Sequence, residues 1–157
     1  DENNFSPTAY YYNPNIHPHE EFIKRFNTLK KYAEMVKLPL LVEEESYVKH
    51  VADFMQGAFG MKTPDRCRHC YQIRLKAAAQ TAKKNKIEYF TTTLMISPYQ
   101  DIDEIKRIGK QNAKEFGVEF VVDDFHKGYK RSRELSKAMG LYMQKYCGCI
   151  YSLTEKK

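Results

Sequence analysis

Short apolar runs alternate with helical patterns along this chain, and that alternation most limits the folds open to it. Residues 87–93, Ile-Glu-Tyr-Phe-Thr-Thr-Thr, are rich in β-branched and aromatic residues and are the clearest predicted strand. A helical spacing of apolar residues follows over 101–116, and another apolar run covers 118–122. Strands separated by helices favour a parallel sheet, because parallel neighbours need a long crossover connection.

The remaining segments continue this pattern. We predict two further strands and four further helices: strands at 8–12 and 38–43, and helices at 19–36, 46–55, 66–82 and from 127–131 to Gly140. The interpretation is an α/β fold, with a three-layer, Rossmann-like parallel sheet and helices on both faces. Ligands of such folds bind beyond the carboxyl ends of the strands, which points to the loops at 13–17, 93–100 and 123–129.

Loop and cap residues set the expected boundaries. Ser46 is expected to cap the helix at 46–55, and Gly57, Gly60 and Pro64 are expected to mark an irregular loop after it. The chain has 157 residues, a length that suits one ordinary hydrophobic core. We therefore expect residues 1–157 to form a single α/β domain.

Four cysteines occur in two pairs of different spacing, Cys67-Arg68-His69-Cys70 and Cys147-Gly148-Cys149. The first pair can aim both sulfurs at one point when it opens a helix, because positions three apart share a helical face. The positive end of that helix favours thiolate over thiol. The second pair can close only a small ring, which strains a disulfide and makes it easy to reduce.

Spacing alone leaves several interpretations of the cysteines open. With the second pair folded over the first, a structural zinc ion with four thiolate ligands is the commonest explanation. An iron-sulfur cluster is the next, and buried inert thiols are the third.

Composition limits the partners and the location. The net charge of +6 arises from 26 Lys and Arg against 20 Asp and Glu, which suits an anionic partner but also suits solvated helix faces. No stretch approaches the roughly eighteen apolar residues of a membrane span, and the polar start Asp1-Glu2-Asn3-Asn4 lacks a signal-peptide core. We expect a cytoplasmic protein with no membrane partner. In the reducing cytosol, CxxC spacing more often indicates metal binding or redox catalysis than a structural disulfide.

Several segments together carry a resemblance to a known family: Tyr12-Asn13-Pro14-Asn15-Ile16-His17-Pro18, Arg66-Cys67-Arg68-His69-Cys70-Tyr71, Thr91-Thr92-Thr93-Leu94 with Ser97-Pro98-Tyr99-Gln100, and Gln144-Lys145-Tyr146-Cys147-Gly148-Cys149-Ile150-Tyr151-Ser152. From about Ala9 to Leu153 the chain resembles the QueH-type epoxyqueuosine reductases. The resemblance implies a cytoplasmic iron-sulfur oxidoreductase of tRNA processing. Its expected reaction is the last step of queuosine biosynthesis, the reduction of the epoxide of epoxyqueuosine in tRNA to the cyclopentene without cobalamin.

The resemblance also implies roles for the cysteines. Cys67 and Cys70 would be two ligands of a [4Fe-4S] cluster, and Cys147 and Cys149 would form a redox-active disulfide that an external electron donor reduces. Whether an additional iron lies beside the cluster is left open. The family normally has a Cys-Cys pair ahead of the segment that corresponds to Ala9, and this sequence has none there. We expect that the first βα unit is missing from the sequence, which also lacks an initiator Met, because a parallel sheet without one strand would expose a long edge.

The other candidate site residues are acidic, basic and aromatic. Asp124 is predicted to be a catalytic acid or polar contact, with a helix-capping carboxylate as the simpler interpretation. The anticodon loop of tRNA is expected to meet a basic and aromatic surface: Lys127, Tyr129, Lys130, Arg131 and Arg133, with Arg66, Arg68 and His69 beside the cluster. His17 and Tyr99 are predicted to contact the substrate, although a lone His is more often structural.

Two functions from other classes compete with the reductase. One is a zinc-stabilised nucleic-acid-binding module without turnover, which would bind one colourless zinc ion. The other is a thiol-disulfide oxidoreductase that uses Cys67 and Cys70 and binds no metal.

Overall fold

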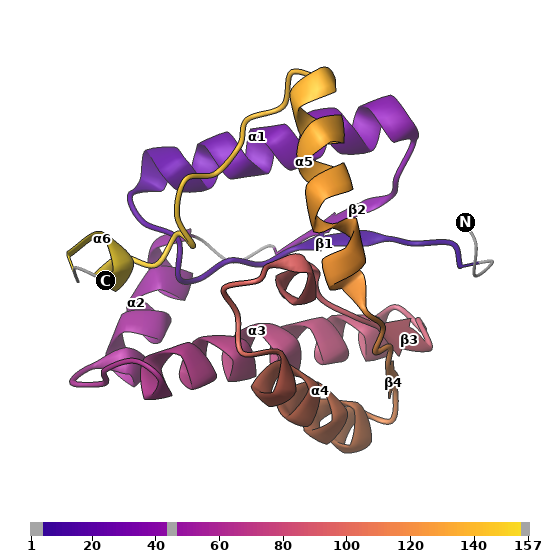
Figure 1. Ribbon diagram of the computed structural model, residues 1–157. Coiled ribbons are helices and arrows are strands. Elements are labelled where there is room, and N and C mark those ends of the chain that lie inside the picture. The colour runs from indigo at the N-terminus through magenta and orange to yellow at the C-terminus, as the bar shows by residue number, and fades with distance from the viewer. Residues whose placement is uncertain (1–4, 44–46, 155–157) are drawn as a thin grey trace. The chain divides into compact units, whose positions relative to one another are not determined.

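The structure is a computed structural model that describes residues 5–43 and 47–154 (Figure 1). The chain divides into two compact units. Unit 1 contains residues 1–52 and 136–157, and unit 2 contains residues 53–135. Two helices, α2 (Tyr47–Ala58) and α5 (Tyr129–Ala138), cross the boundaries between them.

Unit 1 is built on a parallel βαβ segment. The strands β1 (Ala9–Tyr11) and β2 (Leu40–Val42) pair in parallel, and α1 (His19–Val36) forms the crossover between them. Tyr11 fixes the helix on the strand, because its ring packs against Phe22 and Phe26 at centroid distances of 5.2 Å each and its hydroxyl donates to the Phe22 carbonyl. The C-terminal segment of the unit, with α6 (Tyr151–Thr154), returns to the loop between β1 and α1.

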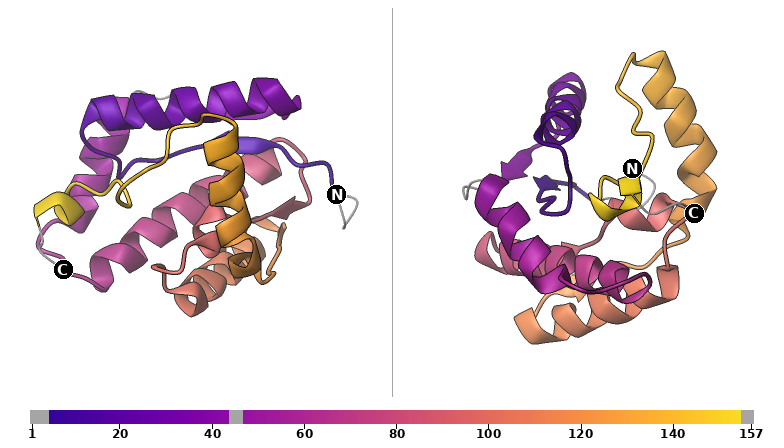
Figure 2. Two further views of the ribbon diagram at one scale, coloured as in Figure 1. Left: turned by 45° about the horizontal axis from the view of Figure 1, so that its top comes forward. Right: turned by 90° about the vertical axis from the view of Figure 1, so that its left-hand side faces the viewer.

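Unit 2 repeats the parallel arrangement with a second pair of strands. Its elements, in chain order, are α3 (Asp65–Lys84), β3 (Tyr89–Phe90), η1 (Thr93–Ile96), α4 (Ile102–Phe116), β4 (Glu119–Phe120) and η2 (Phe125–Gly128). β3 and β4 pair in parallel across α4, in the register Phe90 to Phe120. Helices α3 and α4 pack side by side, as Figure 2 shows.

The core of unit 2 lies where α3 and α4 meet. Leu75, Ile105 and Ile108 are almost fully buried there, with exposed fractions of 1%, 0% and 2%. Each buried side chain of this size contributes roughly 1.5–3 kcal/mol relative to an exposed one. Gly109 lets the other face of α4 approach β4, since a Cβ at this position would overlap the ring of Phe120. This packing holds the carboxyl ends of β3 and β4 in place.

The structure confirms a mixed α/β fold with short parallel strands. The strands are shorter than predicted; the run at 87–93 keeps only Tyr89–Phe90 as strand and then turns into η1. The helix predicted at 46–55 continues to Ala58, so the prediction of a loop at Gly57 is wrong. Gly57 is needed inside the helix, because a Cβ there would lie 2.5 Å from the His69 ring.

Ser46, the predicted cap of α2, lies outside the described residues. Val36, the last residue of α1, is 46% exposed. The three-layer sheet and the single domain remain predictions. Among the helices of the described residues, none combines the length and the apolar character that crossing a bilayer requires.

Candidate functional site

Cys67 and Cys70 lie at the start of α3, as the sequence predicts. The helix begins after Pro64, with Asp65 in its first turn, so Cys67 belongs to the first turn and Cys70 to the second. Both side chains are half-buried, and both are thiols. The pair therefore offers two sulfurs one helical turn apart, near the positive end of the helix dipole.

Arg66 fixes the loop that leads into this helix. Its side chain is 4% exposed and donates to the Met61 carbonyl and to the Thr63 hydroxyl, both at 3.1 Å. The expectation that Arg66 belongs to a nucleic-acid-binding surface is therefore wrong, because a buried guanidinium cannot meet a phosphate. His69 packs against Gly57 and stacks on Phe54 at 5.9 Å, and its burial lowers the pKa of the imidazole.

Tyr71 joins the cysteine helix to the loop before α4. Its hydroxyl donates to Gln100 Oε1 at 2.9 Å and accepts the Asp101 N–H at 3.4 Å. Burial raises the pKa of Tyr71 to about 12, although the hydrogen bond from the Asp101 N–H lowers it; any negative charge on Cys67 and Cys70 adds a smaller contribution in the same direction as burial. The tyrosine is thus a neutral hydroxyl beside the two sulfurs.

The segment Ser97-Pro98-Tyr99-Gln100 is held at both ends. Tyr71 holds Gln100, and His126 holds Ser97, with 3.0 Å between His126 Nε2 and the Ser97 carbonyl. Since a carbonyl only accepts, Nε2 carries the proton in this contact. Tyr99, which lies between the two anchors, is 75% exposed. This segment therefore connects the cysteine helix with the loop that follows β4.

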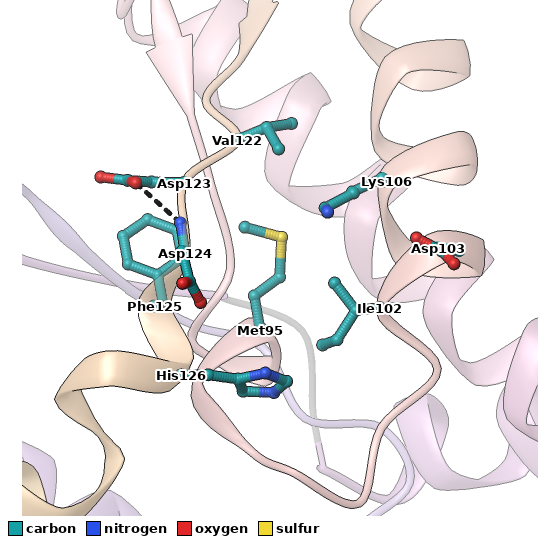
Figure 3. A pocket seen from close by; sticks show the side chains of 9 residues that line it. All are labelled: Met95, Ile102, Asp103, Lys106, Val122, Asp123, Asp124, Phe125 and His126. Atoms are coloured by element: carbon teal, nitrogen blue, oxygen red, sulfur yellow. Dashed lines mark hydrogen bonds between the residues drawn. The ribbon is translucent and has the colours of Figure 1, made fainter.

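A cavity of about 520 Å³ lies in unit 2 beyond the carboxyl ends of β3 and β4. This is where a parallel sheet with helical crossovers places a ligand. Apolar and charged side chains line it in nearly equal number (Figure 3): Met95, Ile102, Asp103, Lys106, Val122, Asp123, Asp124, Phe125 and His126.

The charged groups of the cavity do not all point inward. In Figure 3 the Lys106 ammonium extends from α4 toward Met95, and Asp124 lies on the other side of Met95 with its carboxylate beside Phe125. Asp103 points outward from α4, and Asp123 accepts the Asp124 N–H at 2.7 Å. The cavity thus combines carboxylates and an ammonium with apolar side chains, which suits a polar ligand with an apolar body.

The predicted basic surface is exposed beside this cavity. Lys127 lies in η2 and pairs with Asp124 at 3.3 Å, and Arg131 lies on the first turn of α5. Tyr129 is half-buried, and the guanidinium of Arg133 covers one face of its ring at 5.8 Å. Tyr99 is therefore better suited to stacking than Tyr129.

The second cysteine pair lies in unit 1, next to His17. The His17 N–H donates to the Gly148 carbonyl at 2.9 Å, and the His17 carbonyl accepts the Tyr146 hydroxyl at 2.6 Å. Ile16 and Cys149 form an isolated antiparallel bridge. The predicted residues His17, Cys147 and Cys149 thus come together in one local structure, while the remaining predicted site residues belong to unit 2.

Arg25 anchors the Cys-Gly-Cys loop to α1. Its guanidinium donates to the carbonyls of Tyr146 and Cys147 at 2.8 and 3.1 Å and lies over the Tyr146 ring at 5.2 Å. Gly148 has a φ of +100°, and a Cβ there would lie 2.9 Å from Arg25 Nη1. Only glycine gives the backbone this conformation and the room for the guanidinium.

Glu21 and Tyr142 complete this anchor. Glu21 pairs with Arg25 at 2.7 Å and accepts the Tyr142 hydroxyl at 2.7 Å. Burial opposes ionisation of Glu21, but the hydrogen bond from Tyr142 and the charge of Arg25 outweigh it and lower the pKa of the carboxyl.

Sequence reasoning missed Lys106, His126, Arg25 and Tyr71 as parts of the site. His126 was accessible to prediction, because it lies two residues after Asp124 in a loop already selected. Nothing in the sequence near Arg25 indicates its role, because the carbonyls that it binds lie more than a hundred positions away. Across residues 5–43 and 47–154, no three His, Cys, Asp or Glu side chains gather as a metal site.

Comparison with known proteins decides the family. The sequence profile of the family described as epoxyqueuosine reductase QueH matches residues 1–155. The chain belongs to this family. It is 37% identical over 155 residues to the epoxyqueuosine reductase QueH of Dehalococcoides mccartyi, covering 99% of this chain and 83% of that protein. The protein of the same name from Thermotoga maritima is 36% identical over 156 residues, covering 94% of this chain and 80% of that protein.

Membership in the QueH family makes the chain an oxidoreductase by relationship. The segments that carried the resemblance correspond to the local structures described above: the His17 turn, the start of α3, the Ser97–Gln100 segment and the Cys-Gly-Cys loop. The family assignment predicted from the sequence is confirmed.

Proposed function

We propose that this protein is an epoxyqueuosine reductase that reduces the epoxide of epoxyqueuosine in tRNA to queuosine, with an iron-sulfur cluster and without cobalamin. The observation that carries the proposal is the pair of thiols at the start of α3 in a chain of the QueH family. Two hydrogen bonds, from Tyr71 to Gln100 and from His126 to Ser97, link the helix that carries this pair with the lining of the cavity through the Ser97–Gln100 segment.

The cysteine pair fits half of the ligand set of a [4Fe-4S] cluster. Such clusters are held by four cysteine thiolates, of which Cys67 and Cys70 would supply two. No third candidate ligand joins them within the part of the chain that the structure describes. The proposal therefore requires ligands from elsewhere, and an additional iron would need its own. When bound, the cluster supplies electrons for the reduction.

The reaction needs two electrons and two protons, and the epoxide oxygen leaves as water. In our proposal the cavity of unit 2 binds the modified base, with its apolar side chains against the ring system and Asp124 as the polar contact for the substituent. Lys106 and His126 are the proton-bearing groups that line the same cavity. A positioned donor at the epoxide oxygen typically accelerates such a step by about a hundredfold or more.

The tRNA would be held outside the cavity. We propose that Tyr99 stacks on a base of the anticodon loop, and that Lys127 and Arg131 contact phosphates beside it. The exposure of these three side chains supports this proposal. His17, in the segment between β1 and α1, would contact the substrate. An external donor would return Cys147 and Cys149 to the dithiol state.

We also propose that the two parallel strand pairs belong to one three-layer sheet in a single domain. The proposed location of the protein is the cytoplasm. In a single domain the two units would unfold together. Urea unfolding followed at 222 nm and by tyrosine fluorescence tests this: coincident transitions support a single domain, and separate transitions contradict it.

The function is tested by an anaerobic assay of the full-length protein on tRNA that contains epoxyqueuosine. We expect conversion to queuosine, measured by nucleoside mass spectrometry. Asp124→Asn should lower turnover strongly, whereas the control Glu115→Gln, an exposed carboxylate of α4 that does not line the cavity, should not. A colourless protein with one zinc and no turnover would instead support the nucleic-acid-binding module.

A further inference from the structure

We propose that Cys147 is the sulfur at which the Cys-Gly-Cys loop exchanges with its external reductant, and that Ser152 is the residue that positions this sulfur. The inference rests on the proposed function, because it takes the pair to be redox-active. It states which of the two sulfurs reacts with the reductant, and it assigns a role to the hydroxyl of Ser152, which lies outside the pair.

The two sulfurs differ in access. Cys147 is exposed, whereas Cys149 is half-buried and its backbone forms the bridge with Ile16. The carbonyl of Gly148, between them, is held by the His17 N–H. Thiol-disulfide exchange depends on which sulfur an incoming thiolate can reach. The accessible sulfur of this loop is that of Cys147.

Ser152 contacts both cysteines. The Cys147 thiol donates to Ser152 Oγ at 3.3 Å, and the Ser152 hydroxyl donates to the Cys149 carbonyl at 2.6 Å. The Ser152 backbone N–H donates to that same carbonyl at 3.0 Å. The carbonyl therefore keeps a donor when the hydroxyl turns away from it.

This arrangement prepares a partner for a thiolate. Once Cys147 has lost its proton it can only accept a hydrogen bond, and the Ser152 hydroxyl lies close enough to turn and donate to it. Hydrogen bonds to an ionised acceptor are roughly twice as strong as those between neutral groups. Ser152 would thus stabilise Cys147 whenever it attacks or leaves as a thiolate.

The exchange then runs in two balanced steps with an external dithiol as reductant. One thiolate of the reductant attacks Cys147 Sγ, the disulfide of the pair breaks, and Cys149 leaves as a thiolate and takes up a proton. The second thiolate of the reductant attacks the reductant's own sulfur in the mixed disulfide. Cys147 leaves as a thiolate, accepts the hydrogen bond from Ser152 and takes up a proton. The reductant becomes a disulfide, and the pair gains two electrons and two protons.

The greater reactivity of Cys147 is tested with the reduced full-length protein and 5,5′-dithiobis(2-nitrobenzoate) as the exchange probe. The site of each mixed disulfide is located by peptide mass spectrometry, which separates this loop from Cys67 and Cys70. We expect Cys147 in the Cys149→Ser variant to react at least about tenfold faster than Cys149 in the Cys147→Ser variant. Equal rates, or a faster Cys149, would overturn the inference.

The role of Ser152 is tested by three substitutions. Ser152→Ala should slow the reaction of Cys147 by about five- to tenfold, and Ser152→Thr, which keeps the hydroxyl, should restore it. Ser132→Ala is the matched control, because the Ser132 hydroxyl also donates to the carbonyl three residues earlier, at 2.8 Å. An unchanged rate in Ser152→Ala, or an equal loss in Ser132→Ala, would contradict the positioning role.

These results separate the inference from the function on which it rests. If Cys147 reacts first and Ser152 speeds it, but epoxyqueuosine is not reduced, the inference about the loop stands and the proposed function fails. If the protein reduces epoxyqueuosine and Cys149 reacts first, the proposed function stands and the inference fails.

Discussion

The anchor of the Cys-Gly-Cys loop can be tested by replacing Arg25 with methionine, which keeps the aliphatic stem and removes the charge. Arg25 and Glu21 have side chains that are only 11% and 8% exposed, and their atoms approach to 2.7 Å. Arg25→Met leaves Glu21 with the hydrogen bond from Tyr142 but without a countercharge. The carbonyls of Tyr146 and Cys147 lose their guanidinium donor at the same time.

The expected loss follows from the burial of this pair. Removing one partner of a buried ion pair typically costs about 3–5 kcal/mol, because the other charge remains buried without compensation. We expect Arg25→Met to lower the free energy of unfolding by about 3 kcal/mol, the low end of that range. The double variant Arg25→Met with Glu21→Gln should recover about half of the loss, since a neutral amide needs no countercharge.

The assay is urea unfolding of the reduced protein, followed by circular dichroism. Amide hydrogen exchange of His17 adds a local measurement, because this N–H donates to the Gly148 carbonyl in the loop that Arg25 holds. Faster exchange at His17 in Arg25→Met would show that the loop has loosened. A loss below about 1 kcal/mol, with no recovery in the double variant, is the behaviour of an exposed ion pair and would refute the reasoning.

Three further predictions concern Glu21, Gly109 and Tyr71. In the folded protein the pKa of Glu21 is below its ordinary value of 4.5, so the ionised carboxylate stabilises the fold above that pH, and this stabilisation is lost as the pH falls through the folded pKa. The urea midpoint of unfolding should therefore decrease as the pH is lowered from 4.5, and Glu21→Gln should make this decrease smaller. Gly109→Ala should lower the free energy of unfolding by about 1–3 kcal/mol, because the new Cβ would overlap the ring of Phe120. An unchanged Tm would contradict the close packing of α4 on β4. Tyr71→Phe removes the hydrogen bond to Gln100, so we expect a loss of about 1 kcal/mol and slower turnover; wild-type kcat would show that this contact does not matter to the site.

The sequence predicted the order and type of the elements well, because each depends on a local pattern. Asp101 accepts the Glu104 N–H at the start of α4, and Gly117 ends that helix at a φ of +65°. The extent of the strands could not be read in the same way, since pairing partners decide where a strand ends. Gly57 was misjudged for a related reason: its place in a helix depends on the His69 ring, which the local sequence does not reveal.

The candidate site residues were predictable where a single short segment of the sequence contains the residues that indicate their function. The cysteine spacing placed Cys67 and Cys70 on one helix, and the loop rule selected Asp124 beyond a strand. The residues that hold the loops in place were not predictable, because their partners lie far along the chain. Arg25 reaches carbonyls more than a hundred residues away, and the Tyr71 hydroxyl meets a loop 29 residues later.

The most direct test of the proposed function is the iron content of the Cys67→Ser variant. The full-length protein would be purified without oxygen beside wild type and Cys147→Ser, and iron would be measured per chain. We predict several irons per chain in wild type and in Cys147→Ser, and loss of this iron together with reductase activity in Cys67→Ser. Iron and activity retained in Cys67→Ser would contradict the assignment of the α3 thiols as cluster ligands.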